Sequence, residues 1–361
     1  MCLCLGLAIH WCSYCGLGCG DVVSHCHSAS SGDRRAYWVS TCAAWSGYNA
    51  YRREVEGSFP RQHEEVENSM RHLLSIEEYD KDSLLSLFNL AQHYQNGGPN
   101  RHLYFDREKS TKILANLFYE PSTRTSSSFF AAMKKLGYDV LPINGVHYSS
   151  VTKGETLEDT IQTLASYVDV IALRHPEVGA ARRAAHVSSV PIINAGDGVG
   201  EHPTQTLLDL YTIWQKFGKI DTLTITMMGD LKNGRTVHGL LNILRLFNVK
   251  IQLVSPDNLI APFQYAHGVN IYSSGYLTKF VAGQSDVLYM TRVQKERGSV
   301  GEYELTEEDV ANFKENMIVL HPFPRNKEIP TWFDFDPRAY YFRQIKNGLY
   351  VRMAILSRIL E

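Results

Sequence analysis

The chain has 361 residues, of which 44% are hydrophobic and 20% are charged, and its formal net charge is -2. This length and composition are ordinary for a soluble globular protein of two or three domains. A balanced charge without a basic stripe predicts no binding to nucleic acid, and no apolar run is long enough to predict a membrane span. Small molecules and other protein surfaces are therefore the expected partners.

The cysteines are confined to the N-terminal segment. All seven lie in the first 42 residues, where Cys12 and Cys15 form a C-x-x-C pair. A zinc knuckle is one interpretation of this segment, but the spacings match no common zinc site. We therefore expect residues 1–69 to be a disordered, Cys-rich extension and linker. The rest of the chain has no thiol for a disulfide, a nucleophile or a metal site, which is typical of a reducing compartment and predicts a cytoplasmic protein.

From about residue 70, short apolar runs alternate with helical patterns. Strands are predicted at residues 113–119, 170–174, 191–194, 223–229, 250–254, 286–292 and 317–322. Helices are predicted at residues 75–95, 125–137, 154–169, 202–218 and 234–249, where apolar side chains recur at helical spacing. This alternation is typical of parallel sheets covered by helices on both faces. We predict an α/β fold with two domains, each a parallel sheet flanked by helices.

Polar side chains follow most of these strands. In open α/β sheets, ligands bind at the carboxyl ends of the strands. The arginines at such positions include Arg124, Arg174, Arg235 and Arg292. A single arginine is usually only solvated, but several that converge can hold carboxylate or phosphate oxygens in pairs. The sequence therefore predicts a pocket for a substrate with several negative groups.

One junction, the stretch "FYEPSTRTSSSF", combines hydroxyl groups with an arginine where a helix follows a strand. The side chains at its centre are Ser122, Thr123, Arg124 and Thr125. A helix N-terminus offers free backbone N–H groups and a partial positive charge, so we predict a phosphate site here. The alternative is that the hydroxyls only cap the helix, but a single cap needs neither an arginine nor further hydroxyls.

The chain after residue 69 contains no G-x-S-x-G, H-E-x-x-H or Walker A motif. A chemistry without a nucleophile or a metal indicates direct group transfer that depends on positioning and electrostatics, and we expect no cofactor. Arg174 and His202 are candidate donors to an oxyanion on a polarised carbonyl. The alternative for His202 is a histidine that is buried in the core with its hydrogen bonds satisfied and has no role in the chemistry.

Over roughly residues 70–361, the chain resembles the aspartate carbamoyltransferase family. The motifs that carry the resemblance, in the family's order, are "FYEPSTRT", "KGETLEDTI", "LRHPEVGAA", "INAGDGVGEHPTQTLLDL", "GDLKNGRTVHGLL", "DVLYMTRVQKER", "HPFPR" and "YFRQIKNGLYVRMAIL". The wording "STRTSSSF" looks most like the domain in the animal multifunctional pyrimidine-synthesis polypeptide. The resemblance implies transfer of the carbamoyl group of carbamoyl phosphate to L-aspartate, which gives N-carbamoyl-L-aspartate and phosphate in de novo pyrimidine biosynthesis.

The resemblance also implies a role for each motif residue. The phosphate of carbamoyl phosphate is expected to bind Ser122, Thr123, Arg124 and Thr125. Catalytic contacts to its carbonyl oxygen are expected from Thr125, Arg174 and His202, and a contact to its nitrogen from Gln205. Aspartate is expected to contact Arg235, Arg292, Gln294 and the backbone around Phe323 and Pro324. A neighbouring subunit is expected to supply Ser149 and Lys153, Lys153 serving both substrates, which makes a homotrimer with shared active sites the smallest active unit.

In the transcarbamoylase fold that the resemblance implies, the carbamoyl-phosphate-binding domain comprises residues 70–204 plus 345–361, and the aspartate-binding domain residues 205–344. Segments 257–285 and 298–316 are shorter than in the family, where the second is a mobile loop that closes the aspartate side. A non-catalytic homologue that binds carbamoyl phosphate, or acts as an oligomerisation module, is therefore the alternative function. A transcarbamoylase for ornithine is disfavoured, because "TRVQKER" is basic and "HPFPR" lacks the cysteine expected in ornithine enzymes.

Overall fold

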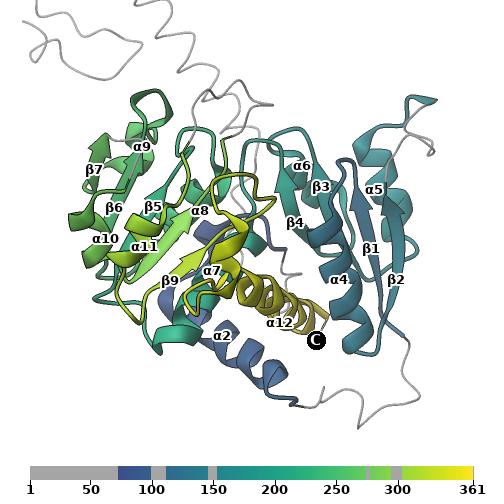
Figure 1. Ribbon diagram of the computed structural model, residues 1–361. Helices are drawn as coiled ribbons and strands as arrows, with labels where there is room; N and C mark the ends of the chain where they lie inside the picture. Colours follow the sequence, from purple (N-terminus) through teal and green to yellow (C-terminus); the bar gives the residue numbers. More distant parts are fainter. Residues whose placement is uncertain (1–71, 99–110, 145–152, 274–276, 294–302, 361) are drawn as a thin grey trace, which may run out of the picture. The chain divides into compact units, whose positions relative to one another are not determined.

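The computed structural model describes residues 72–98, 111–144, 153–273, 277–293 and 303–360 (Figure 1). The segment 1–69, expected to be an extension and linker, lies outside these ranges. Within the described ranges, strands and helices alternate along the chain. No helix of this described part is long and apolar enough to cross a membrane.

Two parallel sheets organise the described residues. The strand order is β2-β1-β3-β4 in one sheet and β7-β6-β5-β8-β9 in the other, and every pairing is parallel. The strands are β1 (Ile113–Phe118), β2 (Asp139–Asn144), β3 (Val170–His175), β4 (Ile192–Asp197), β5 (Thr224–Met228), β6 (Lys250–Ser255), β7 (Asn270–Ser273), β8 (Val287–Met290) and β9 (Ile318–Leu320). The prediction of two parallel sheets flanked by helices is therefore confirmed.

Two strands, β2 and β7, were not predicted from the sequence, and each lies at an edge of its sheet. In β2, Pro142 pairs with Asn116 of β1, and Leu141 is 38% exposed. Proline lacks the N–H that a central strand must donate, so within sheets it is found at edges. These strands lack the continuous apolar run of a strand buried on both faces, and that run was the signal used to predict the others.

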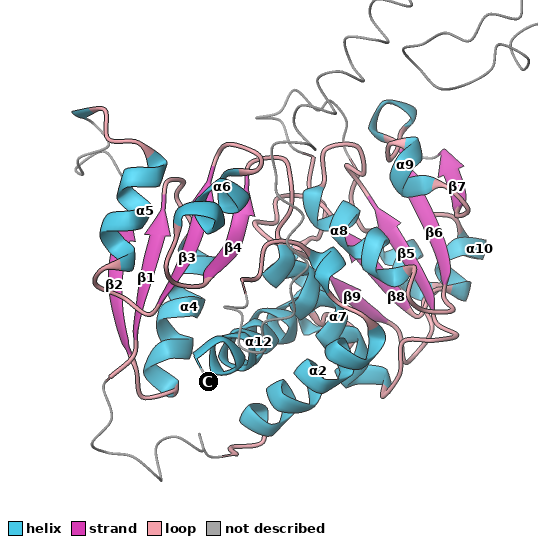
Figure 2. Cartoon of the chain, turned by 180° about the vertical axis from the view of Figure 1, so that it is seen from behind, coloured by secondary structure: helices cyan, strands magenta, loops and turns pink. Residues whose placement is uncertain are grey.

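The helices cover the sheets as Figure 2 shows. They are η2 (Ile76–Glu78), α2 (Lys81–Gln95), α4 (Thr123–Lys135), α5 (Leu157–Ala165), α6 (Ala180–Val187), α7 (Pro203–Phe217), α8 (Arg235–Leu244), η5 (Asp257–Leu259), α9 (Phe263–Ala266), α10 (Lys279–Gln284), α11 (Glu307–Ala311), η7 (Thr331–Phe335) and α12 (Tyr341–Leu360). The helix predicted at residues 75–95 is interrupted, because the Asp80 carboxylate accepts a hydrogen bond from the backbone N–H of Ser83, at 2.8 Å, and starts α2 there.

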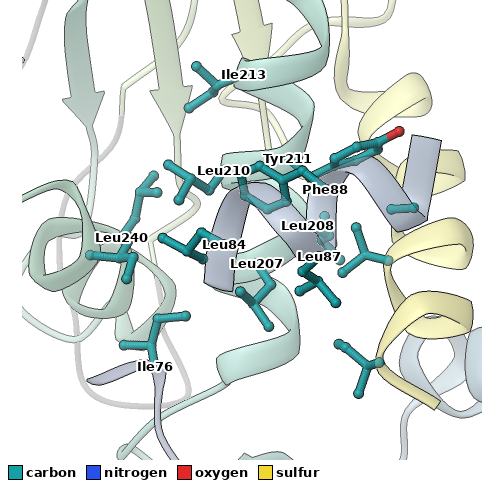
Figure 3. Packing of buried hydrophobic residues seen from close by; sticks show 14 of the residues in the cluster. Ile76, Leu84, Leu87, Phe88, Leu207, Leu208, Leu210, Tyr211, Ile213 and Leu240 are labelled. Atoms are coloured by element: carbon teal, nitrogen blue, oxygen red, sulfur yellow. The ribbon is translucent and has the colours of Figure 1, made fainter. Parts of the chain in front are cut away.

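A helical core lies between the two sheets. In both views α12 lies there, and it packs against α2, α4 and α7. Figure 3 shows Leu84, Leu87 and Phe88 of α2 meeting Leu207 and Tyr211 of α7, and all five side chains are fully buried. The apolar face predicted for α2 is thus the face that it buries. This packing holds the start of α7, and with it His202, in a fixed place between the sheets.

Candidate active site

A cavity of about 650 Å³ opens at the carboxyl ends of strands from both sheets. It is lined by residues that follow β1, β4, β5, β8 and β9 and by the end of β3. The predicted site residues that line it are Ser122, Thr123, Arg124, Thr125, Arg174, His202, Gln205, Arg235, Arg292, Phe323 and Pro324. The structure therefore brings together, in one cavity, residues that run from Ser122 to Pro324 in the sequence.

Three predicted site residues have a different status. Lys153 is exposed and does not line this cavity of its own chain. Ser149 and Gln294 lie outside the described residues. The expected contribution of Ser149 and Lys153 from a neighbouring subunit stays a prediction.

The N-terminus of α4 forms one wall of the cavity. Ser122 is the N-cap, with extended backbone (φ -152°, ψ 96°), and among the described residues its side chain makes no capping hydrogen bond. Thr125, the third residue of the helix, is buried and lines the cavity. The Ser126 hydroxyl has a structural role instead, because the Asn116 side-chain amide donates to Ser126 Oγ at 3.1 Å and to its backbone oxygen at 3.0 Å. The hydroxyl groups are thus not all caps, and the first turn of α4 remains available for an anion.

Positive charge converges on this wall. Burial lowers the pKa of Arg124, and the charges of Arg174 and Arg292 lower it further. Arg174 donates from Nε to a carboxylate oxygen of Glu120 at 3.2 Å, and both of these side chains line the cavity. Three guanidinium groups that influence one another in this way repel, and an anion between them removes that cost.

His202 is the N-cap of α7 and is buried, with 6% of its surface exposed. Its Nε2 lies 3.4 Å from Thr125 Oγ1, and its Nδ1 lies 3.4 Å from Thr204 Oγ1. Burial, followed by the charges of Arg235, Arg174 and Arg352, lowers the pKa of His202 well below its usual value of 6.5. The ring is therefore neutral near pH 7 and has one N–H to donate. This favours a hydrogen-bond donor over a general acid at this position.

The opposite wall follows strands of the five-stranded sheet. Arg235 begins α8 and donates to the backbone oxygen of Gly198, and Arg292 is half-buried just after β8. The turn after β9 is held by His321, whose Nδ1 accepts from the Phe323 N–H at 2.9 Å. The peptide bond between Phe323 and Pro324 is cis. The Phe323 ring lies 5.9 Å from the Arg124 guanidinium, so the two walls meet at this point.

Arg325 also follows a strand, β9, but its side chain points away from the cavity. Its guanidinium donates to the Asp334 carboxylate at 2.6 Å and to the Tyr341 hydroxyl at 3.1 Å. Arg325 does not line the cavity, and its charge is paired with the η7 carboxylate. Through these contacts Arg325 links the turn after β9 to η7 and α12.

Several cavity residues were not predicted from the sequence, among them Gln344 and Arg352. Arg352 is 3% exposed, and its guanidinium donates to Ser128 Oγ at 3.2 Å and to Thr204 Oγ1 at 3.3 Å. Burial lowers the pKa of Arg352 to about 10. Both residues belong to the helix α12, whereas only residues after strands had been considered. The available signal was that these polar residues lie on the face of α12 that carries its apolar residues.

Two family models match the chain in succession. The description "Aspartate/ornithine carbamoyltransferase, carbamoyl-P binding domain" matches residues 71–215. The description "Aspartate/ornithine carbamoyltransferase, Asp/Orn binding domain" matches residues 221–359. The exact domain boundaries at residues 204–205 and 344–345 stay a prediction.

Curated and solved relatives agree with this match. The chain is 47% identical to the multifunctional protein CAD of Squalus acanthias, over 80% of this chain but only 13% of that protein. It is 46% identical to the aspartate carbamoyltransferase catalytic subunit of Archaeoglobus fulgidus, over 81% of this chain and 99% of the relative. The Trypanosoma cruzi aspartate transcarbamoylase, solved with N-(phosphonacetyl)-L-aspartic acid, is 43% identical, with a TM-score of 0.73 over 81% of this chain and 96% of that chain. Sequence and structure together place this chain in the aspartate/ornithine carbamoyltransferase family, among the aspartate carbamoyltransferases.

Proposed function

We propose that this chain is an aspartate carbamoyltransferase of de novo pyrimidine biosynthesis. It transfers the carbamoyl group of carbamoyl phosphate to the amine of L-aspartate, and gives N-carbamoyl-L-aspartate and phosphate. The observation that carries the proposal is the convergence of four arginines, Arg124, Arg174, Arg235 and Arg292, on one cavity that contains a helix N-terminus. Such a cavity suits a phosphate on one side and two carboxylates on the other.

The carbamoyl phosphate side lies at the start of α4. Its phosphate binds the first-turn N–H groups and the side chains of Ser122, Thr123, Arg124 and Thr125. The carbonyl oxygen accepts hydrogen bonds from Thr125, Arg174 and the neutral ring of His202, which support its negative charge as the amine attacks. Gln205 contacts the carbamoyl nitrogen. Placing these donors beforehand lowers the barrier, because they need not reorganise during the reaction.

The aspartate side lies after β5, β8 and β9. Arg235, Arg292 and Gln294 bind the two carboxylates, and the backbone around Phe323 and Pro324 lines the centre. The aspartate nitrogen forms a bond to the carbonyl carbon, and the bond between that carbon and the phosphate oxygen breaks. The departing phosphate is itself a base and can take the proton that the amine loses.

The same proposal includes a cytoplasmic homotrimer in which a neighbouring subunit adds Ser149 and Lys153 to each cavity. The position of Lys153, exposed and away from the cavity of its own chain, supports this arrangement. Mixing Arg124→Ala chains with Lys153→Ala chains tests it. If the site is shared, about a quarter of all interfaces in an equal, randomly exchanged mixture carry both intact residues, and activity returns to about that level. Mixtures that stay as inactive as their parents contradict a shared site.

The activity itself is tested with the purified full chain, carbamoyl phosphate and either L-aspartate or L-ornithine. We expect carbamoyl-aspartate from aspartate and no citrulline from ornithine. A folded chain that binds carbamoyl phosphate but releases no carbamoyl-aspartate would contradict the proposed activity. That outcome would favour a non-catalytic homologue.

A further inference from the structure

Asp209 is a fully buried carboxylate directly behind the cavity. It lies on α7, one helical turn after Gln205, and does not itself line the cavity. Three side chains donate to it: Gln205 Nε2 to Oδ1 at 2.8 Å, Gln344 Nε2 to Oδ1 at 2.6 Å, and Tyr289 OH to Oδ2 at 2.8 Å. These donors come from α7, α12 and β8, so Asp209 joins elements that form both walls of the cavity.

This contact decides which end of the Gln205 amide faces the cavity. When Asp209 is ionised, its carboxylate can only accept hydrogen bonds, so the group that Gln205 turns towards it is the NH₂. The carbonyl oxygen of Gln205 is then the end of the amide left for a ligand. Gln205 lines the cavity and is only partly buried. The cavity thus presents an acceptor, rather than a donor, at this position.

Gln344 also turns its NH₂ towards Asp209, as Gln205 does. Its Oε1 accepts a hydrogen bond from the backbone N–H of His321, at 2.9 Å. A backbone N–H can only donate, so the Gln344 NH₂ must point the other way, towards Asp209. The direction of each bond is therefore fixed from the His321 N–H through Gln344 and Asp209 to Gln205.

We propose that Asp209 is a positioning residue that holds Gln205 as a hydrogen-bond acceptor and so makes the cavity select a transferred acyl group that carries an NH₂. An amide NH₂ donates to this oxygen, whereas a methyl group in the same place leaves the oxygen unpaired. The inference rests on the proposed function for the place of the carbamoyl group. It goes further in assigning the choice between carbamoyl and acetyl groups to a residue that touches neither substrate.

Two stable ligands of the same shape provide the test. Phosphonoacetamide carries the NH₂, and 2-oxopropylphosphonate carries a methyl group in its place. Titration calorimetry on the full-length protein gives the ratio of their dissociation constants. We expect the wild type to bind the amide about tenfold more tightly, which is the size of one buried neutral hydrogen bond. The ratio needs no turnover.

The variants separate positioning from general structural support. In Gln205→Met the ratio should fall to about one, because the acceptor is gone. Asp209→Ser, which admits water, and Asp209→Leu, which keeps the volume, should give the same loss, because neither fixes the amide. Asp209→Asn should keep most of the preference, since its oxygen can face the two glutamines. On the Gln205→Met background, Asp209→Ser should change the ratio no further.

The control is Thr226→Val, which removes a buried hydroxyl in β5 that does not line the cavity. It should weaken folding without changing the ratio. If the wild-type protein and Gln205→Met give the same ratio, the inference is overturned, even if no Asp209 variant folds. It is also overturned if folded Asp209→Ser or Asp209→Leu keeps the ratio of the wild type. The expected ratios in a chain that makes no carbamoyl-aspartate would keep this inference and overturn the proposed activity. A chain that makes carbamoyl-aspartate but binds the two ligands equally would keep the proposed activity and overturn this inference.

Discussion

The two walls of the cavity present positive charge by different means. On the side of the four-stranded sheet, the first turn of α4 contributes backbone N–H groups beside the side chains of Arg124 and Arg174. On the side of the five-stranded sheet, the charge comes from side chains that follow strands, chiefly Arg235 and Arg292. Backbone donors are fixed by the helix itself, whereas long side chains lose conformational freedom when they bind.

This difference teaches how the two substrates are distinguished. A helix N-terminus attracts any compact anion of the right size, so a phosphate can bind there before the other substrate. Two arginine forks are specific for the spacing of two carboxylates. We therefore expect the helix-end wall to be stable in the absence of ligand and the arginine wall to become ordered when aspartate binds.

The largest expected effect comes from breaking the helix-end wall. Arg124→Ala should weaken phosphonoacetamide binding by about 100-fold, because a charge-assisted pair of hydrogen bonds to the phosphonate is lost. Calorimetry on the purified variant measures this. Arg183→Ala is the matched control, since Arg183 pairs at the surface with Glu177 at 2.7 Å. Equal weakening in both variants would mean that net charge, and not this site, attracts the ligand.

The arginine wall can be broken separately. Arg292→Ala should raise the KM for aspartate by about 50-fold and leave phosphonoacetamide binding within about twofold of the wild type. Arg245→Ala, in which a contact to the Gln264 backbone oxygen is lost, serves as the control at the C-terminal end of α8. An unchanged KM in Arg292→Ala would show that aspartate binds elsewhere.

A smaller effect concerns the pH dependence of folding at the helix-end wall. The pKa of His202 is well below 6.5 in the folded chain, so below pH 6.5 the unfolded chain takes up a proton that the folded chain does not. The free energy of unfolding therefore falls as pH decreases from about 6.5. His202→Asn removes this contribution, so its loss of stability between pH 7.5 and 5.5 should be smaller than the wild-type loss by about 1 kcal/mol.

Urea unfolding of both proteins at the two pH values measures the difference. Other histidines, such as the half-buried His238 and the buried His321, also have a lowered pKa and contribute equally to both proteins. The comparison therefore isolates His202. Parallel pH profiles for the two proteins would mean that His202 titrates normally in the folded chain.

The smallest expected effect is a pH dependence of the ligand preference, caused by Asp209, which connects the two walls. Burial raises the pKa of Asp209 to about 7, against the lowering effects of its three hydrogen-bond donors and the charge of Arg352. Asp209 is therefore mostly ionised at pH 8 and mostly protonated at pH 6, where it is a weaker acceptor. The preference for phosphonoacetamide over 2-oxopropylphosphonate should be about twofold larger at pH 8.

Ionisation of the phosphonate affects both ligands and cancels in the ratio. The groups that face Asp209 from the surrounding elements are Gln205, Tyr289, Gln344 and, by its charge, Arg352. In Asp209→Asn the ratio should not depend on pH. A pH-dependent ratio that survives in Asp209→Asn would place the titration in another group.

How much the sequence predicts depends on where a residue lies in the fold. Central strands such as β3 and β5 are continuous apolar runs because helices cover both faces, and all of these were predicted. The edge strands β2 and β7 have exposed side chains and carry no such signal. Cavity residues after strands, such as Arg174 and Arg292, follow from the rule that ligands bind at strand ends.

Residues that reach the cavity from helices could not be found by that rule. Gln344 and Arg352 line the cavity from α12, and Asp209 lies behind it on α7. All three are buried, and only tertiary packing brings them to the site. A single sequence gives their helical period but not which side of a helix meets another helix. Which end of the Gln205 amide faces the cavity is harder still to predict, since it depends on hydrogen bonds between three separate elements.

The position of α12 has a consequence for synthesis on the ribosome. Arg352 contacts Ser128, which lies 224 residues earlier in the chain. Contacts of such long sequence separation form late, because a long loop must close before they stabilise anything. Strands of the first sheet therefore emerge, and can pair, well before the helix that covers α4 and completes the cavity. Until α12 has been translated, the nascent chain exposes apolar surface of α2 and α4. A chaperone that binds apolar helices can bind this surface during that whole period.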